Sequence, residues 1–347
     1  MSDARENKWL NEKGLVALAY TALASTQVVM AMWNVVGSKL VNHDVDLPLI
    51  VFVTGRQLVA SVLLGVAAAI KHGPDCVMVQ RKHIRATVAS SIMGQYMSPI
   101  FYLYGLQAVS ATLASIFDGP LVPIIAYVIA LCVGAEALPT LMIERKIVLS
   151  AMFLATSGAA LLIFSLGDSS GDGTEDGDEY VSTGSSKLYV LALAALFIEA
   201  ASLSTSIVIQ KPLTIVYPLL SYSFRSCLGG FIMAAIHVSL WVPGGFVTNM
   251  LLLVNACIES WHFRTALLMS SVGNSLLNTL FTAVANSRLP SSTVALGACL
   301  QPIFTLILEV LLTDATFTAV ELFSFVVIAV GMYMFTQRRD PFGLLIA

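Results

Sequence analysis

The feature that most constrains this chain is a series of ten apolar stretches separated by short polar segments. A helix that rises 1.5 Å per residue needs about 20 residues to cross the roughly 30 Å hydrocarbon core of a bilayer. Transmembrane β-strands are about 10 residues long and alternate in polarity, whereas these stretches are continuously apolar. We therefore expect an all-α polytopic membrane protein with ten transmembrane helices at residues 14–38, 47–70, 86–107, 110–132, 146–166, 188–210, 214–240, 265–286, 290–312 and 318–337.

The composition agrees with a chain whose main partner is the lipid bilayer. Of the 347 residues, 57% are hydrophobic and 11% are charged, compared with about 25% charged residues in a typical soluble domain. The net charge of −3 comes with no basic stripe, so we expect no nucleic-acid partner. The five cysteines show no CxxC spacing, which argues against a disulfide framework and a metal site. We expect no cofactor.

The loop charges predict the orientation in the membrane. With the N-terminus in the cytoplasm, 13 of the 18 Lys and Arg residues fall in inner loops and three fall in outer loops. Short cytoplasmic loops are enriched in Lys and Arg, so both termini should be cytoplasmic in a multi-pass integral membrane protein. No targeting motif distinguishes the plasma membrane from an endomembrane. The two remaining basic residues, Arg56 and Arg225, lie within predicted spans.

An internal repeat divides the chain. Residues 167–187 are rich in Gly, Ser, Asp and Glu and predict an acidic disordered linker between a first repeat at 1–166 and a second at 188–347. A shift of 180 residues aligns Ser91-Ile-Met-Gly with Ser271-Val-Gly-Asn and Phe101 with Phe281. With five spans in each unit, the second enters the membrane from the opposite side. Inverted repeats of this kind place transport sites at their interface.

Several short motifs resemble a known family. They include Gly37-Ser-Lys39, Arg56-Gln-Leu-Val-Ala60, Tyr102-Leu-Tyr-Gly-Leu106, Ser110-Ala-Thr-Leu-Ala-Ser115, Ile209-Gln-Lys211, Tyr217-Pro218 and Gly331-Met-Tyr333. Their order resembles the EamA-type units of the drug/metabolite transporter superfamily, and most closely the plant nodulin-like, walls-are-thin-related transporters. The resemblance implies transport of amino acids, auxin or other metabolites. The chain departs from the plant pattern at Asp118, where Asn is usual, and at Asp314, where Glu is usual.

Two acidic residues within predicted spans are candidates for substrate binding and charge coupling. A charge at the bilayer centre costs about 2.5–3.5 kcal/mol on insertion scales, so it needs a partner, water or a function. Glu199 has no other charge within a helical turn. If it faces a cavity, removal from water would favour its protonated form, which suits proton coupling. A structural ion pair is the alternative. Asp118 precedes Gly119-Pro120, an interrupted helix typical of transport sites or of a kinked packing helix.

Arg56 and Arg225 occupy matching positions of the two repeats, which favours a structural role for both. The alternative is a carboxylate clamp, since a guanidinium group can bind a carboxylate through two hydrogen bonds.

Neutral polar residues complete the expected substrate-binding set. Gln95 and Tyr102 are seven residues apart and therefore share a helix face. Asn278 and Gln301 lie in the second repeat, where their amides would bind a polar solute through hydrogen bonds. Amides in membrane helices also join neighbouring helices, usually by about 1 kcal/mol or less, and Asn274 fits that role better.

These features predict a secondary transporter that moves a small organic solute, an amino acid or related carboxylate-bearing metabolite, by alternating access. No GxxxxGK[ST] loop is present, so any accumulation of solute must draw on a gradient. We do not expect an enzyme, because the sequence lacks HExxH and GxSxG motifs. A non-transporting membrane adaptor or receptor is the main alternative, and an intramembrane enzyme is the weaker one.

Overall fold

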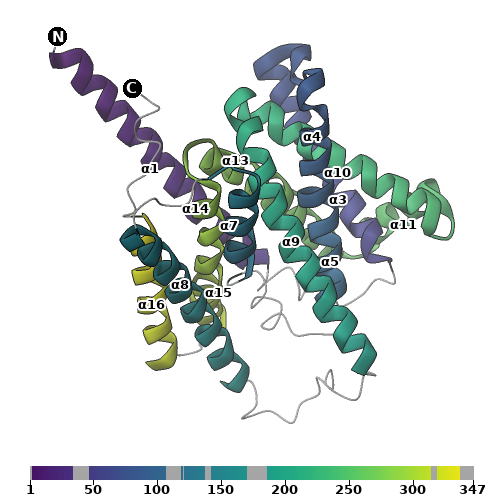
Figure 1. Ribbon diagram of the computed structural model, residues 1–347. Coiled ribbons are helices and arrows are strands. Elements are labelled where there is room, and N and C mark those ends of the chain that lie inside the picture. Colours follow the sequence, from purple (N-terminus) through teal and green to yellow (C-terminus); the bar gives the residue numbers. More distant parts are fainter. Residues whose placement is uncertain are drawn as a thin grey trace.

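The computed structural model of the protein describes residues 2–33, 47–106, 119, 121–136, 142–169, 186–313 and 319–336. Within these ranges the secondary structure is helical and contains no β-strand (Figure 1). Five segments are long and apolar enough to cross a membrane, which is the arrangement of a membrane-embedded helical protein: Gly14–Met32, Leu49–Cys76, Val190–Val216, Leu219–Trp241 and Trp261–Arg288. Val122–Cys132, Gly245–Glu259 and Leu322–Phe335 are shorter apolar helices.

The described residues of the first half form six α-helices, one π-helical segment between α4 and α5, and two 3-10 turns. In chain order these are α1 (Ser2–Met32), α3 (Leu49–His72), η2 (Gly73–Cys76), η3 (Arg81–His83), α4 (Ile84–Ser91), the π-helical η4 (Ile92–Met97), α5 (Ser98–Leu106), α7 (Val122–Cys132) and α8 (Met142–Ser169).

The second half begins with a helix that extends past the predicted span at both ends. Its elements are α9 (Ser186–Val216), α10 (Leu219–Trp241), α11 (Gly245–Glu259), α12 (Trp261–Met269), the π-helical η6 (Ser270–Leu277), α13 (Asn278–Arg288), α14 (Ser291–Leu296), the 3-10 turn η7 (Gly297–Leu300), α15 (Gln301–Thr313) and α16 (Ala319–Thr336).

The described residues of the ten predicted stretches are helical, except for Leu47, Pro48, Tyr217, Pro218 and Pro290, which precede helix starts. The count of ten crossings stays a prediction. The predicted linker overlaps the helices at its edges, because α8 continues to Ser169 and α9 starts at Ser186. Its remaining residues, 170–185, lie outside the described ranges.

Proline fixes the start of two helices at corresponding places. Pro48 precedes α3 with φ −55° and ψ 133°, and Pro218 precedes α10 with φ −54° and ψ 130°. Proline lacks the backbone N–H that a helix start leaves without an intrahelical partner, so it suits this position.

Two helices are interrupted by a wider π-helical segment. η4 separates α4 from α5, and η6 separates α12 from α13. A π-helical turn contains an extra residue and is frequent at functional sites. The segments carry Gln95 and Asn274, so both polar side chains project from irregular parts of the backbone.

The helices of the two halves pack against one another. α3 packs against α10, and α8 lies beside α16 (Figure 1). α1 packs against α13 and α15, while α9 packs against α5 and α7.

Glycines bring α8 and α16 close: a Cβ on Gly331 would lie 2.5 Å from the backbone nitrogen of Ala155. A Cβ on Gly158 would lie 3.0 Å from the nitrogen of Ile328. Such small-residue contacts are typical of membrane helix pairs.

Two apolar clusters border the centre of the bundle. One surrounds Phe52 of α3, which stacks on Trp33 with ring centroids 6.0 Å apart. The other joins α1, α7, α9, α13 and α14 through residues such as Leu23 and Ile207. Members of both clusters line a cavity between the helices. The packed core therefore positions a polar site at its centre.

Candidate functional site: a charged cavity between the two halves

The cavity has a volume of about 120 Å³ and is lined by helices from both halves of the chain. The lining side chains come from α1, α3, η4, α5, α7, α9, η6, α13, α14, η7 and α15. Its walls combine apolar surface with amides, hydroxyl groups, one carboxylate and one guanidinium group. Pockets of this kind bind small molecules through a few positioned polar groups.

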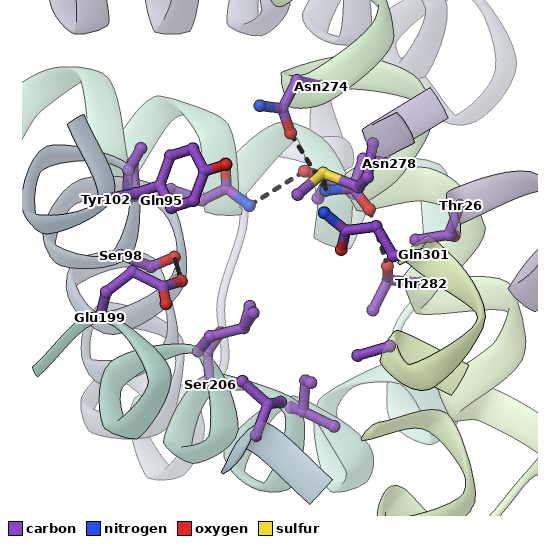
Figure 2. A pocket seen from close by; sticks show the side chains of 18 of the residues that line it. Thr26, Gln95, Ser98, Tyr102, Glu199, Ser206, Asn274, Asn278, Thr282 and Gln301 are labelled. Atoms are coloured by element: carbon purple, nitrogen blue, oxygen red, sulfur yellow. Dashed lines mark hydrogen bonds between the residues drawn. The ribbon is translucent and has the colours of Figure 1, made fainter. Parts of the chain in front are cut away.

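Glu199 supplies the carboxylate. It lies on α9 and is 2% exposed. Ser98, at the start of α5, donates a hydrogen bond from its Oγ to Glu199 Oε1 at 2.9 Å (Figure 2). Because α5 packs against α9, this bond fixes the carboxylate on the cavity wall. A carboxylate held there can interact with a cationic group or take up a proton.

Arg56 supplies the guanidinium group. It is 5% exposed, and its Nη1 donates to Ser270 Oγ at 3.3 Å. Its Nε has no hydrogen-bond partner in the part of the chain that the structure describes. Among the residues that the structure describes, no carboxylate forms an ion pair with Arg56. A buried charge without a counter-charge is costly, so this arrangement suits an anionic group in the cavity.

Gln95 belongs to a network that joins three helices. Gln57 Nε2 donates to the backbone oxygen of Gln95 at 2.9 Å and to its Oε1 at 3.1 Å. Gln95 Nε2 in turn donates to Thr279 Oγ1 at 2.9 Å (Figure 2). Both ends of the Gln95 amide are thus bound by protein groups. The arrangement fixes the amide on the cavity wall and links η4 to α3 and α13.

A second network surrounds Asn278. Its Nδ2 lies 3.3 Å from both Asn274 Oδ1 and Met30 Sδ, and its Oδ1 accepts a hydrogen bond from Thr282 at 3.2 Å. Figure 2 shows Asn274, Asn278 and Thr282 on the same side of the cavity. The contact with Met30 attaches α1 to α13, so Asn278 both lines the cavity and joins helices.

The cavity brings together most of the residues that the sequence singles out. Five of the six predicted substrate-binding residues line it, together with one of the two arginines: Arg56, Gln95, Tyr102, Glu199, Asn278 and Gln301. The sixth, Asp118, lies outside the described residues.

Arg225 lies elsewhere and does not line the cavity. Its Nε donates to the backbone oxygen of Cys76 at 2.7 Å, and its Cζ lies 4.4 Å from the ring centroid of Tyr217. These contacts fasten the turn after α3 to the start of α10. The matching sequence positions of Arg56 and Arg225 therefore do not correspond to matching surroundings.

Two further polar residues of α9, Ser206 and Gln210, line the cavity and were not predicted from the sequence to bind a solute. Together with Glu199 and Leu203 they follow spacings of four, three and four residues, which place side chains on one helix face. That periodicity, starting from Glu199, is the signal that could have identified them.

No group of three or more His, Cys, Asp or Glu side chains in the described ranges could hold a metal ion.

Comparisons with known proteins inform the fold but not the activity. No protein-family model matches the sequence, and no curated protein matches it either. A protein of known crystal structure is similar over 93% of this chain and 96% of its own, with a TM-score of 0.64 and 14% sequence identity. At that identity the similarity indicates a shared fold alone.

Proposed function

We propose that the protein is a secondary transporter that moves a small organic solute by alternating access. The observation that carries the proposal is the cavity in which Arg56 and Glu199, both nearly fully buried, share the walls with amides. Ionisable side chains within membrane helices are rare and typically mark substrate or ion pathways. Transporters bind their substrates between repeats near the bilayer midplane.

The packing of the helices supports two inverted five-helix repeats within a ten-span architecture. An operation that exchanges the halves would leave the α3–α10 and α8–α16 pairs unchanged. The same operation would convert the contact between α1 and α13 into a contact between α9 and α5. The structure contains both contacts. The shift of 180 residues that aligns the two repeats places Ile92, the first residue of η4, at Val272, which lies within η6. These correspondences favour the EamA-type architecture that the sequence motifs resemble.

The charges favour a carboxylate-bearing solute, an amino acid or a related metabolite. Arg56 offers the carboxylate a partner of opposite charge, and guanidinium–carboxylate hydrogen bonds are among the strongest in proteins. The Glu199 carboxylate would interact with an amino group of the solute or take up a proton that couples transport to a pH gradient. The loop charges place both termini in the cytoplasm in this proposal.

Purified protein in liposomes tests the proposal. We expect uptake of at least one member of a panel of labelled amino acids and organic acids, with a rate that depends on the imposed pH gradient. The Glu199→Gln variant removes the titratable group and should move the solute at a rate that no longer follows the gradient. Retained pH dependence in this variant would remove Glu199 from coupling. Vesicles that move no member of the panel would favour an adaptor or receptor, and chemical conversion of a panel member in detergent would favour an enzyme.

A further inference from the structure

Three N–H donors on the cavity walls, one on each of three helices, are buried without a hydrogen-bond partner among the described residues. Arg56 Nε on α3, Gln210 Nε2 on α9 and Gln301 Nε2 on α15 are buried and make no hydrogen bond within the described structure. A buried donor without a partner is costly, because it has given up its bond to water. The cavity is therefore suited to a solute that presents several oxygen acceptors, and a single carboxylate at Arg56 would leave two amides without a partner.

Of the three donors, Gln301 is the one whose position on the cavity wall is seen most directly. Its side chain is 3% exposed and lines the cavity. It lies at the first residue of α15, directly after the 3-10 turn η7. Figure 2 shows its amide projecting from the wall toward the interior of the cavity. The nearby hydroxyl of Thr305 donates to the backbone oxygen of Gln301 at 2.9 Å and not to its side-chain amide.

The orientation of the Gln210 amide follows from its surroundings. Its Oε1 accepts a hydrogen bond from Tyr222 Oη at 3.2 Å, and Tyr222 Oη also lies 2.8 Å from Ser90 Oγ. Because the oxygen is bound by the hydroxyl, the free end of the amide is its NH₂ group, which can only donate. Gln210 is 5% exposed, so bulk water does not satisfy this donor.

We propose that Gln210 and Gln301 form a donor subsite that binds a further oxygen acceptor of the solute, such as a carbonyl, amide or sulfoxide oxygen. The subsite makes the protein selective for solutes with an oxygen-bearing side chain over apolar solutes of the same shape. A site that hydrogen-bonds a substrate group discriminates strongly against the analogue that lacks it. This inference rests on the proposed transport function and adds the residues that determine its specificity.

Methionine sulfoxide and methionine are suitable probes. They share the carboxylate, the amino group and the chain length, and they differ by one oxygen that only accepts hydrogen bonds. Each compound is offered as the labelled solute to liposomes that contain the wild-type protein, Gln301→Met or Gln210→Met. The matched control is Thr26→Val, because Thr26 lines the cavity while its hydroxyl bonds to the backbone oxygen of Ala22 at 3.1 Å.

We expect the wild-type protein to prefer methionine sulfoxide by about 5- to 100-fold in uptake efficiency, the range that one buried hydrogen bond supplies. Each Gln→Met variant should bring the ratio of the two uptake efficiencies close to 1 by slowing the uptake of methionine sulfoxide more than that of methionine, and Thr26→Val should keep the wild-type ratio. Variants that slow both compounds equally, or leave the ratio unchanged, would overturn the subsite and leave the transport proposal intact.

A second measurement separates the subsite from transport itself. If wild-type vesicles move neither compound, the proposed transport of amino acids fails. The thermal stabilisation of the purified protein by each compound then decides the subsite alone. Greater stabilisation by methionine sulfoxide that disappears in Gln301→Met supports the subsite, and equal or zero stabilisation by the two compounds overturns it.

Discussion

At the scale of single residues, the two arginines show how far surroundings decide a role. Arg56 and Arg225 occupy similar places in the sequence repeat, but only Arg56 lines the cavity. Arg56 has one hydrogen bond, to Ser270, whereas Arg225 binds the Cys76 carbonyl and lies over the ring of Tyr217. The surroundings of Arg56 suit ligand binding, whereas the contacts of Arg225 suit a role in holding the turn after α3 against α10.

Replacing each arginine by methionine separates these roles. We expect Arg56→Met to raise the KM for a carboxylate solute by about 10- to 100-fold, the loss of a charge-assisted hydrogen bond. Its thermal stability in detergent should be equal or higher, because the change removes a buried charge for which the described residues supply no counter-charge.

Arg225→Met is the matched control for that prediction. It should lower the free energy of unfolding by about 1–3 kcal/mol, through loss of the bond to Cys76 and of the contact with Tyr217. The KM should change little. Thermal unfolding and solute uptake by the two variants check both statements, and a loss of stability in Arg56→Met with unchanged KM would assign Arg56 a structural role instead.

At the scale of elements, the contact between α8 and α16 depends on the absence of side chains. The Cβ of an alanine at Gly331 would lie 2.5 Å from the nitrogen of Ala155 and 2.8 Å from the carbonyl oxygen of Ala151. Both atoms belong to the backbone, so no side-chain rotation can relieve the overlap. The helices would have to move apart.

Gly331→Ala should therefore destabilise the protein by about 1–3 kcal/mol, the usual cost of overpacking. Thermal unfolding in detergent measures the effect. Gly14→Ala is the control, because nothing lies within 4 Å of the added Cβ in α1. Alanine favours a helix over glycine, so this variant should be as stable as the wild type or more stable. Equal stability of the two variants would contradict the close approach of α8 and α16.

The π-helical segment η4 gives a second prediction at this scale. A π-helical turn accommodates one extra residue within an α-helix. Deleting Met93 should let η4 become regular α-helix while α4 and α5 keep their packing. The Gln95 amide would then lose its alignment with Thr279. We expect near-normal thermal stability with a loss of solute uptake of about tenfold or more, since a hydrogen-bonded wall of the cavity is displaced.

A one-residue deletion within α8, at Leu149, is the control for the Met93 deletion. α8 continues as regular helix for several turns on either side of this residue, so no extra residue is there to be removed. This deletion should rotate the following part of α8 away from α16 and destabilise the protein. Full uptake after deletion of Met93 would show that the π-helical segment does not shape the site.

At the scale of the whole molecule, sequence reasoning reached the helical architecture and several of the polar residues that line the cavity. Apolar runs locate helices because crossing a bilayer imposes their length, and buried charges such as Glu199 stand out against an apolar background. The π-helical segments, the contacts that Arg225 makes with Cys76 and Tyr217, and the inclusion of Gln210 in the cavity were not predicted, although a structural role for Arg225 was the favoured interpretation. They depend on which helices meet, and a periodicity within one helix does not contain that information. Asp118 lies outside the described residues, so its role stays a prediction.

At one end of the bundle, hydrogen bonds join the two halves of the chain. The Glu136 carboxylate, just after α7, accepts hydrogen bonds from the backbone nitrogen and the hydroxyl of Ser292 at 2.8 and 2.6 Å. Asn286 Nδ2 donates to the backbone oxygen of Ile207 at 2.7 Å, and Ile207 lines the cavity. Since charge-assisted bonds are the stronger ones, alternating access would require Glu136 and Ser292 to separate whenever the cavity opens toward this end.

Weakening this link should shift the protein toward the state that is open at this end. A cysteine introduced by Ser206→Cys, with the exposed Cys132 and half-buried Cys257 replaced by serine, reports access to the cavity. In Glu136→Gln, a membrane-impermeant thiol reagent added on the side of the N-terminus should label this cysteine about 10- to 100-fold faster, the factor that loss of a charge-assisted bond supplies. Labelling from the other side should slow, because two-state access makes the rates move in opposite directions.

Ser287→Ala serves as the control, since Ser287 bonds only within its own helix, to the Val284 oxygen at 2.7 Å. Rates that rise on both sides would indicate loosening of the bundle, and rates that do not change would remove the link between Glu136 and Ser292 from the gating of the cavity.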